Sequence, residues 1–135
     1  MNVNKTRAIV KKKILIVDDS SIIRQKVRKV LEDSHYEVID AIDGMDALAK
    51  LEQEKQIDLI ISDVNMPRMD GLAMVAKARE IPSHKDVAIF MLTSVPNPEM
   101  KAKAKSLGVT AWFLKPYKVE MIVTAIEKYI GKSEI

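Results

Sequence analysis

The chain has 135 residues, of which 47% are hydrophobic and 30% charged, and a formal net charge of +3, a composition typical of one globular domain rather than a disordered chain. The absence of cysteine excludes disulfides and thiolate metal sites, and the two histidines, His35 and His84, are too far apart in sequence to suggest a zinc site. There is neither a signal peptide nor the ~18 apolar residues of a membrane span, so we expect a cytoplasmic protein with no membrane partner and no room for a second, output domain.

Five short apolar runs follow one another along the chain, and each predicts a β-strand. The first, third and fourth are nearly continuous in aliphatic residues, which is typical of strands covered on both faces of a sheet. The runs are Lys13–Asp18, Glu37–Ile42, Ile57–Asp63, Val87–Thr93 and Ala111–Lys115. Residues 1–12 are basic and polar and are predicted to form a flexible leader, residues 13–131 the domain, and residues 132–135 a short tail.

Stretches with helical periodicity lie between and after the predicted strands. The apolar residues that share a predicted helix face are Ile23, Val27, Val30 and Leu31; Leu72, Val75 and Ala76; and Val119, Ile122, Val123, Ile126 and Ile130. The predicted N-caps are Ser20 or Ser21, Asp43, and Asn97 before Pro98, and the predicted helix ends are Gly108 and Gly131. Lys118 stands where a capping side chain is expected for the last helix.

Strict alternation of strands and helices predicts a doubly wound α/β fold, with a parallel sheet and helices on both of its faces. In such folds ligands bind beyond the carboxyl ends of the strands. The residues that end the predicted strands are therefore the first candidates for a functional site.

Four of the five predicted strands end in polar or ionisable residues, namely Asp18 with Asp19, Asp63, Thr93 and Lys115. Three carboxylates brought together repel one another unless a cation compensates, and Mg²⁺ takes one or two carboxylates, several waters and a phosphate oxygen. With the metal bound, an aspartate can act as a nucleophile and form an acyl phosphate. An ammonium and a hydroxyl group nearby can bind the remaining phosphoryl oxygens.

The same residues form a set of motifs that resembles the receiver domain of two-component response regulators, particularly the single-domain chemotaxis type. The matching segments are Ile14–Ser20, Ile61–Pro67 with Met69–Gly71, Leu92–Ser94 and Phe113–Pro116. They occur in the family's order, and the resemblance runs from about Lys12 to Ile130. It implies a flavodoxin-like fold with five strands in the order 2-1-3-4-5, a strand order for which a chemotaxis receiver is a standard example.

The resemblance also implies roles for individual residues. Asp63 would be the phosphoacceptor. Asp19, Asp63 and the backbone carbonyl of Asn65 would bind Mg²⁺ directly (Mn²⁺ could substitute), and Asp18 would bind it through a water. Lys115 would pair with the phosphoryl group and precede a cis peptide bond to Pro116.

Two further residues are assigned to the switch by the same resemblance. Thr93 would be the hydroxyl that moves toward the phosphoryl group. Trp112 occupies the position of the switch aromatic, where the family usually has Tyr, Phe or His. A packing role without switching is an equal alternative for Trp112.

The implied partners are a sensor histidine kinase, or a small phosphodonor, and a separate output protein. The resemblance suggests chemotaxis or motility as the process in which this output protein acts. The output protein would bind the face made by the fourth helix, the fifth strand and the fifth helix, and Lys105 and Lys118 there predict an acidic partner. We expect a monomer, by analogy with relatives that lack effector domains. We expect no nucleic-acid binding, because the lysines at 101, 103 and 105 lack interleaved aromatic residues.

Two other functions fit the predicted architecture less well. A flavin- or nucleotide-binding module needs a loop rich in Ser, Thr and Gly after the first strand, where this chain has Asp18-Asp19. A phosphohydrolase of the aspartyl-phosphate type needs two aspartates two residues apart, whereas these two are adjacent. We therefore expect a signalling receiver that catalyses only its own phosphorylation and slow dephosphorylation.

Overall fold

The structure is a computed structural model, and it describes residues 11–95 and 97–132. Residues 1–10 of the predicted leader and residues 133–135 of the predicted tail lie outside the described residues. The domain boundaries at residues 12 and 132 therefore stay predictions.

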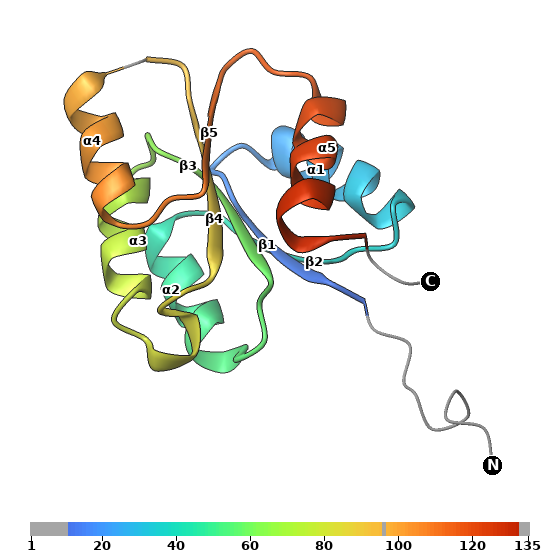
Figure 1. Cartoon of the computed structure of the whole chain (residues 1–135), viewed down its shortest axis with the longest axis horizontal. Helices are drawn as coiled ribbons and strands as arrows, with labels where there is room; N and C mark the ends of the chain where they lie inside the picture. The colour runs from blue at the N-terminus through green and yellow to red at the C-terminus, as the bar shows by residue number, and fades with distance from the viewer. Residues whose placement is uncertain (1–10, 96, 133–135) are drawn as a thin grey trace.

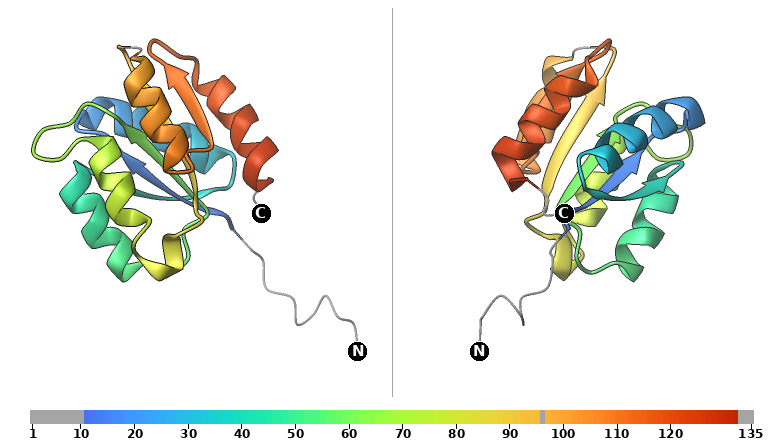
Figure 2. Two further views of the ribbon diagram at one scale, coloured as in Figure 1. Left: turned by 60° about the vertical axis from the view of Figure 1, so that its left-hand side comes forward. Right: turned by 90° about the vertical axis from the view of Figure 1, so that its right-hand side faces the viewer.

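Five parallel strands form one sheet in the order β2-β1-β3-β4-β5, which confirms the predicted flavodoxin-like fold. The strands are β1 (Lys13–Val17), β2 (Glu37–Ala41), β3 (Leu59–Asp63), β4 (Ala88–Thr93) and β5 (Ala111–Leu114). Because the strands are parallel, their carboxyl ends meet at one edge of the sheet. In Figure 2 the arrowheads of β4 and β5 point to the same end of the molecule, where the loops to the next helices begin.

Five α-helices cover the two faces of the sheet. They are α1 (Ser21–Asp33), α2 (Gly44–Gln53), α3 (Gly71–Ala78), α4 (Pro98–Ser106) and α5 (Val119–Ile130), and a short 3₁₀ helix, η2 (Pro82–His84), precedes β4. Figure 1 shows α2, α3 and α4 on one side of the sheet and α1 and α5 on the other.

The sheet therefore has a core layer on each face. Successive strand residues alternate between the layers: Leu15 and Ile60 face α2, α3 and α4, whereas Ile16 and Ile61 face α1 and α5. All four are fully or almost fully buried. Because both faces of these strands are buried, the sequences of the first and third strands are continuous apolar runs.

The strands are shorter than the apolar runs that predicted them. The first, second and fifth end one residue before the predicted ends, and the fourth begins at Ala88 rather than Val87. The third begins at Leu59 rather than Ile57. In the segment before β3, the carboxylate of Asp58 accepts a hydrogen bond from the backbone N–H of Lys13 (2.8 Å). This N–H of β1 is therefore bonded to a side chain instead of a strand carbonyl. Ile57 is buried although it lies outside the strand.

The predicted helix caps agree with the structure. The Ser20 hydroxyl accepts from Ile23 N at the start of α1, Asp43 caps α2, and Asn97 caps α4. Lys118 makes no capping hydrogen bond at α5, as its side chain predicts. Asp70, which the sequence analysis did not single out, caps α3 through Ala73 N.

Most residues of the predicted helix faces lie against the core. Val27, Leu31, Ile122 and Ile126 are buried against one layer and Leu72 and Val75 against the other. The remaining predicted residues are half-buried: Ile23, Val119, Val123 and Ile130, which pack against the first of these layers, and Val30 and Ala76. The two predicted helix ends are confirmed. Gly108 and Gly131 follow α4 and α5 with φ of 76° and 84°, the left-handed region that favours glycine.

Arg79, at the C-terminal end of α3, joins three segments of the chain. Its guanidinium donates hydrogen bonds to the backbone oxygens of Leu107 and Gly108 after α4, and of His84 and Val87 before β4 (2.7–3.2 Å). The C-terminal end of α4 is therefore held by a cation, which also suits the helix dipole there.

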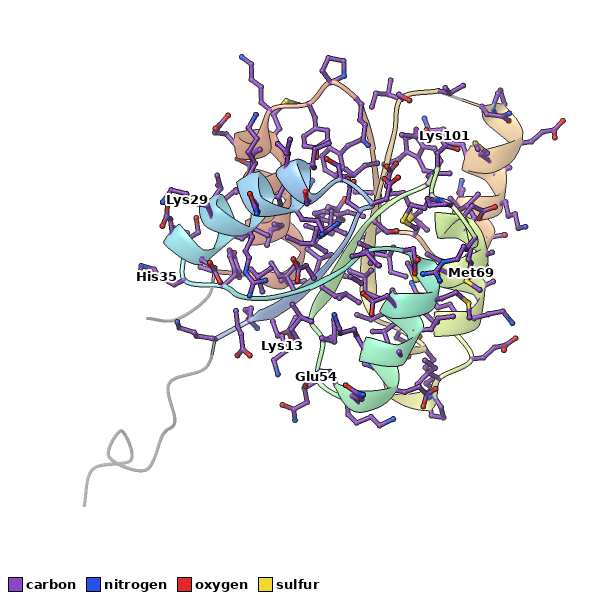
Figure 3. All side chains as sticks on the ribbon, turned by 180° about the vertical axis from the view of Figure 1, so that it is seen from behind. Lys13, Lys29, His35, Glu54, Met69 and Lys101 are labelled. Carbon is purple, nitrogen blue, oxygen red and sulfur yellow. The ribbon has the colours of Figure 1, made fainter. Side chains whose placement is uncertain are left out.

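Polar contacts lie at the amino ends of the strands, opposite the carboxyl ends. Lys13 lies close to Glu54 there, as Figure 3 shows, with Nζ 3.2 Å from the carboxylate. Nearby, the buried ring of His84 places Nε2 within 2.9 Å of the backbone oxygens of Leu51 and Glu54. The ring nitrogen thus donates to the C-terminal carbonyls of α2, which gives His84 a structural contact.

Candidate functional site

The carboxyl ends of β1 and β3 bring three predicted site residues together. Asp18 and Asp19 directly follow β1, and Asp63 is the last residue of β3. One carboxylate oxygen of each lies within 4.8 Å of the others. Asp18 and Asp63 are buried and Asp19 is exposed, so the cluster opens to solvent on the side of Asp19.

Lys115 reaches this cluster from the end of β5. Its Nζ lies 2.9 Å from Asp63 Oδ2 and 3.9 Å from Asp18 Oδ2. Its backbone N–H donates to the carbonyl of Thr93 at 2.8 Å, which ties the ends of β5 and β4 together. The peptide bond between Lys115 and Pro116 is cis, as predicted.

Asp18 is the least satisfied carboxylate of the cluster. Oδ1 accepts from the backbone N–H of Ser20 (2.8 Å), but Oδ2 is buried and has no hydrogen-bond donor among the described residues. Burial is the main cause that raises the pKa of Asp18, and repulsion from Asp63 and Asp19 adds to it, while the Ser20 N–H and Lys115 act in the opposite direction.

These residues fit a hard divalent cation. In the described part of the chain, three carboxylates face a single ammonium group, which leaves negative charge and one buried oxygen without a hydrogen-bond partner. Mg²⁺ prefers oxygen ligands of this kind, and a second positive group beside Asp18 would remove the cost of burying its charge.

Asn65 lies in the loop between β3 and α3, two residues after Asp63, and its side chain is exposed. The loop is held at both ends. The N–H of Gly71 donates to the carbonyl of Val64 at 2.7 Å, and Arg68 pairs with the buried carboxylate of Asp43. The backbone of Asn65 is thus in an anchored loop beside the carboxylate cluster.

Arg68 is a residue that the sequence analysis missed. Its φ of 68° lies in the left-handed region, which costs a non-glycine residue energy. Its guanidinium pairs with Asp43, the N-cap of α2. The N–H of Asp46 and the guanidinium of Arg68 both lower the pKa of Asp43. The position of Arg68 between Pro67 and Met69 was a signal for a turn, but nothing in the sequence identified Asp43 as its partner.

Thr93 ends β4 and is completely buried. Its hydroxyl accepts from the N–H of Val95 (3.2 Å) and lies 3.3 Å from the carbonyl oxygen of the same residue. In this conformation the hydroxyl is therefore engaged with its own loop and makes no hydrogen bond to Asp63 or Lys115.

Trp112, in β5, is half-buried and packs against the core layer under α4. Together with Lys101, Lys105 and neighbouring residues of α4 and β5 it lines a hollow of about 310 Å³. Its indole Nε1 is buried and has no partner among the described residues. Packing is thus part of its role, and switching stays a prediction.

No α-helix in the described part of the chain is both long enough and apolar enough to cross a membrane.

Comparison with known proteins gives one consistent family. A family model for the response regulator receiver domain matches residues 14–127. The chain is 32% identical over 123 residues to the chemotaxis protein CheY1 of Helicobacter pylori, covering 90% of this chain and 99% of that protein. It is also 32% identical over 126 residues to the transcriptional regulatory protein PdtaR of Mycobacterium tuberculosis, covering 93% of this chain but only 60% of that protein's length.

The fold comparison agrees with the sequence comparison. The structure of the chemotaxis response regulator CheY4 of Vibrio cholerae superposes with a TM-score of 0.82 and 42% identity, covering 88% of this chain and 98% of that one. The sequence motifs, the strand order and the acidic cluster at the strand ends agree with these comparisons. The chain belongs to the receiver domain family of two-component response regulators.

Proposed function

We propose that this protein is a cytoplasmic, Mg²⁺-dependent phosphorylation switch in which Asp63 accepts a phosphoryl group from a sensor histidine kinase or a small phosphodonor. The observation that carries the proposal is the meeting of three carboxylates and one ammonium group at the ends of three parallel strands. Phosphorylation and Mg²⁺ binding are general properties of receiver domains, which supports the same assignment.

The metal would be held by Asp19, Asp63 and the backbone carbonyl of Asn65, with Asp18 acting through a coordinated water. Mn²⁺ suits the same oxygen ligands. When bound, the ion neutralises the carboxylates and screens the charge of the incoming phosphoryl group.

In the proposed step, a carboxylate oxygen of Asp63 forms a bond to phosphorus while the bond from phosphorus to the donor's histidine nitrogen breaks. The electron pair of the broken bond remains on that nitrogen, and one proton from solvent keeps the released imidazole neutral. The ammonium group of Lys115, 2.9 Å from Asp63 Oδ2, balances the negative charge that the phosphoryl group brings.

The switch would follow from the added charge. A phosphoryl group on Asp63 attracts the Thr93 hydroxyl, which then leaves Val95, and the loop before α4 rearranges. This shifts the equilibrium between two conformations of the protein. We assign Trp112 to the same transition, since it packs against the core layer under α4 and lines a hollow with Lys101 and Lys105 of that helix.

The output would be read by a separate protein that binds the face of α4, β5 and α5. Leu114 of β5 and Met121 of α5 are exposed apolar side chains, and the exposed Lys105 and Lys118 add positive charge to the same elements. We propose an acidic partner, in chemotaxis or motility as the names of the CheY relatives suggest, and a monomeric receiver that binds no nucleic acid. Binding that is insensitive to salt would count against the acidic partner.

The test is incubation with acetyl phosphate and Mg²⁺, followed by mass spectrometry of the intact protein. We expect a phosphoryl adduct on the wild-type protein that disappears in Asp63→Asn and when Mg²⁺ is chelated. Asp33→Asn, at the exposed end of α1, is the matched control and should be labelled as well as the wild type. Equal labelling of Asp63→Asn would remove Asp63 from its proposed role.

A further inference from the structure

Arg24, on the second turn of α1, contacts the backbone of the acidic cluster. Its Nη1 donates a 2.6 Å hydrogen bond to the carbonyl oxygen of Asp18. The side chain is only 14% exposed, so this contact is shielded from water. A short hydrogen bond from a cation to a carbonyl in such surroundings is among the stronger kinds in proteins.

The other side of the same guanidinium is held by the edge strand. Arg24 Nε lies 3.5 Å from Asp40 Oδ2 in β2, and Asp40 Oδ1 in turn lies 3.2 Å from Nη1 of Arg28. Lys50 donates to the backbone oxygen of Asp40 at 2.6 Å, which fixes that residue from α2. Arg24 is therefore held between an anchored carboxylate and the carbonyl of Asp18.

The hydrogen bond from Arg24 holds the peptide group between Asp18 and Asp19. The carbonyl of Asp18 belongs to the peptide group that leads into Asp19, so its direction fixes how the two carboxylates leave the chain. The N–H of Asp18 is tied to Ala41 O (3.2 Å), and Asp18 Oδ1 is tied to Ser20 N. With Arg24 in place, the N–H, the carbonyl and one carboxylate oxygen of Asp18 all have partners, and only Oδ2 remains to face Asp63 and Lys115.

We propose that Arg24 is a positioning residue for the metal pocket: through the carbonyl of Asp18 it holds the Asp18–Asp19 turn in the conformation that binds a divalent cation. This inference rests on the proposed Mg²⁺ site. Arg24 contacts neither the metal nor the phosphoryl group, and acts by keeping the acidic pair aligned with Asp63 before either arrives.

A purely structural role, joining α1 to β2, is the competing explanation. Arg28 provides the matched control, because it pairs with the same carboxylate of Asp40 and donates to Val38 O (3.0 Å) but has no contact with Asp18. A role in joining α1 to β2 predicts the same outcome for both arginines, whereas a positioning role predicts an effect on metal binding for Arg24 alone.

The experiment is isothermal titration of the full chain with MgCl₂, using the wild type, Arg24→Met, Arg24→Lys and Arg28→Met, with urea unfolding of each without metal. We expect Arg24→Met to weaken Mg²⁺ binding about tenfold or more, as loss of a group behind a metal ligand does. Arg24→Lys, which keeps a donor cation, should recover part of the affinity, and Arg28→Met should stay within about twofold of the wild type.

Two outcomes overturn the inference while the proposed function stands: Arg24→Met binding Mg²⁺ as the wild type does, or Arg28→Met losing as much affinity as Arg24→Met. If Arg24→Met is unfolded, the comparison of Arg24→Lys with Arg28→Met decides, and equal affinities reject the positioning role. A wild-type protein that binds no Mg²⁺ would instead overturn the proposed function, and this inference with it.

Discussion

Gly71 lies directly against the backbone of Asp63. A Cβ atom at position 71 would overlap the carbonyl oxygen of Asp63 and come within 2.8 Å of the Met91 methyl group. The first residue of α3 must therefore be glycine for the helix to start this close to the end of β3. This approach places α3 and the anchored loop before it around the proposed phosphoacceptor.

We expect Gly71→Ala to destabilise the protein by about 1–3 kcal/mol, the usual cost of forcing extra atoms into a packed site. The backbone of Asp63 has to move because the overlapping atom is main chain rather than a flexible side chain. Urea unfolding followed by circular dichroism measures the change. Lys77→Ala, exposed on the same helix, is the control and should change the free energy of unfolding by less than about 0.5 kcal/mol. A Gly71→Ala protein as stable as the wild type contradicts the close approach.

Lys115→Met should change metal binding and phosphorylation in opposite directions. Removing the ammonium group 2.9 Å from Asp63 Oδ2 leaves the pocket more negative, so Mg²⁺ binding tightens. The same change removes a positive group that balances the transferred phosphoryl group, so we expect labelling by acetyl phosphate to slow about 100-fold. Calorimetry and time-resolved mass spectrometry measure the two effects. Lys128→Met, on the exposed side of α5, should alter neither, and wild-type labelling of Lys115→Met would exclude its role in the transfer.

Arg79→Met should destabilise the region where α3, α4 and β4 meet. Four backbone carbonyls lose a charged donor, and each hydrogen bond of this kind contributes about 1.5–3 kcal/mol without being additive, so we expect a loss of about 3 kcal/mol in the free energy of unfolding. Hydrogen exchange gives a local readout: the amides of Leu107 to Val109 should lose protection before those of β1. Unchanged protection there would mean that Arg79 does not hold the end of α4.

Asp43 predicts a pH dependence of stability. Its pKa is lowered below the usual 3.8, chiefly by the N–H of Asp46 and then by Arg68, so the folded state favours the charged form. This contribution is complete above pH 3.8 and is lost as the pH falls through the lower pKa of the folded state.

Substitutions at Asp43 separate the cap from the charge. Asp43→Asn keeps an N-cap acceptor and should cost less than about 1 kcal/mol at pH 7, because Arg68 is largely exposed. Asp43→Ala loses the cap as well and should cost about 1–2 kcal/mol. The difference between the wild type and Asp43→Asn should shrink as the pH falls below 3.8. A difference that is constant down to pH 2.5, measured by urea unfolding, would show that the charge does not contribute.

Much of the fold could be predicted from the sequence because its signals are local. The apolar runs and the capping side chains of Ser20, Asp43 and Asn97 each act within a few residues. The cis bond before Pro116 was expected only from the family resemblance. The grouping of the acidic residues followed from topology alone, since parallel strands end at one edge.

The parts that could not be predicted depend on contacts between distant residues. Arg24 and Arg79 bind backbone carbonyls, which every residue has, so no side-chain pattern marks the partner. Arg68 reaches Asp43 across 25 positions. The start of β3 was predicted too early because Ile57, an apolar residue, is buried in the loop before the strand.

The Thr93 hydroxyl makes two contacts with the backbone of Val95: it accepts from the N–H of that residue and lies beside its carbonyl oxygen. If the hydroxyl moved toward Asp63, both contacts would be broken at once. If the backbone of Val95 moved, the hydroxyl would lose both contacts as well. In the proposed switch, an intermediate with the hydroxyl away from Val95 and not yet at Asp63 would leave a buried hydroxyl without a partner, which costs free energy. We therefore expect the protein to populate the two end states and little in between.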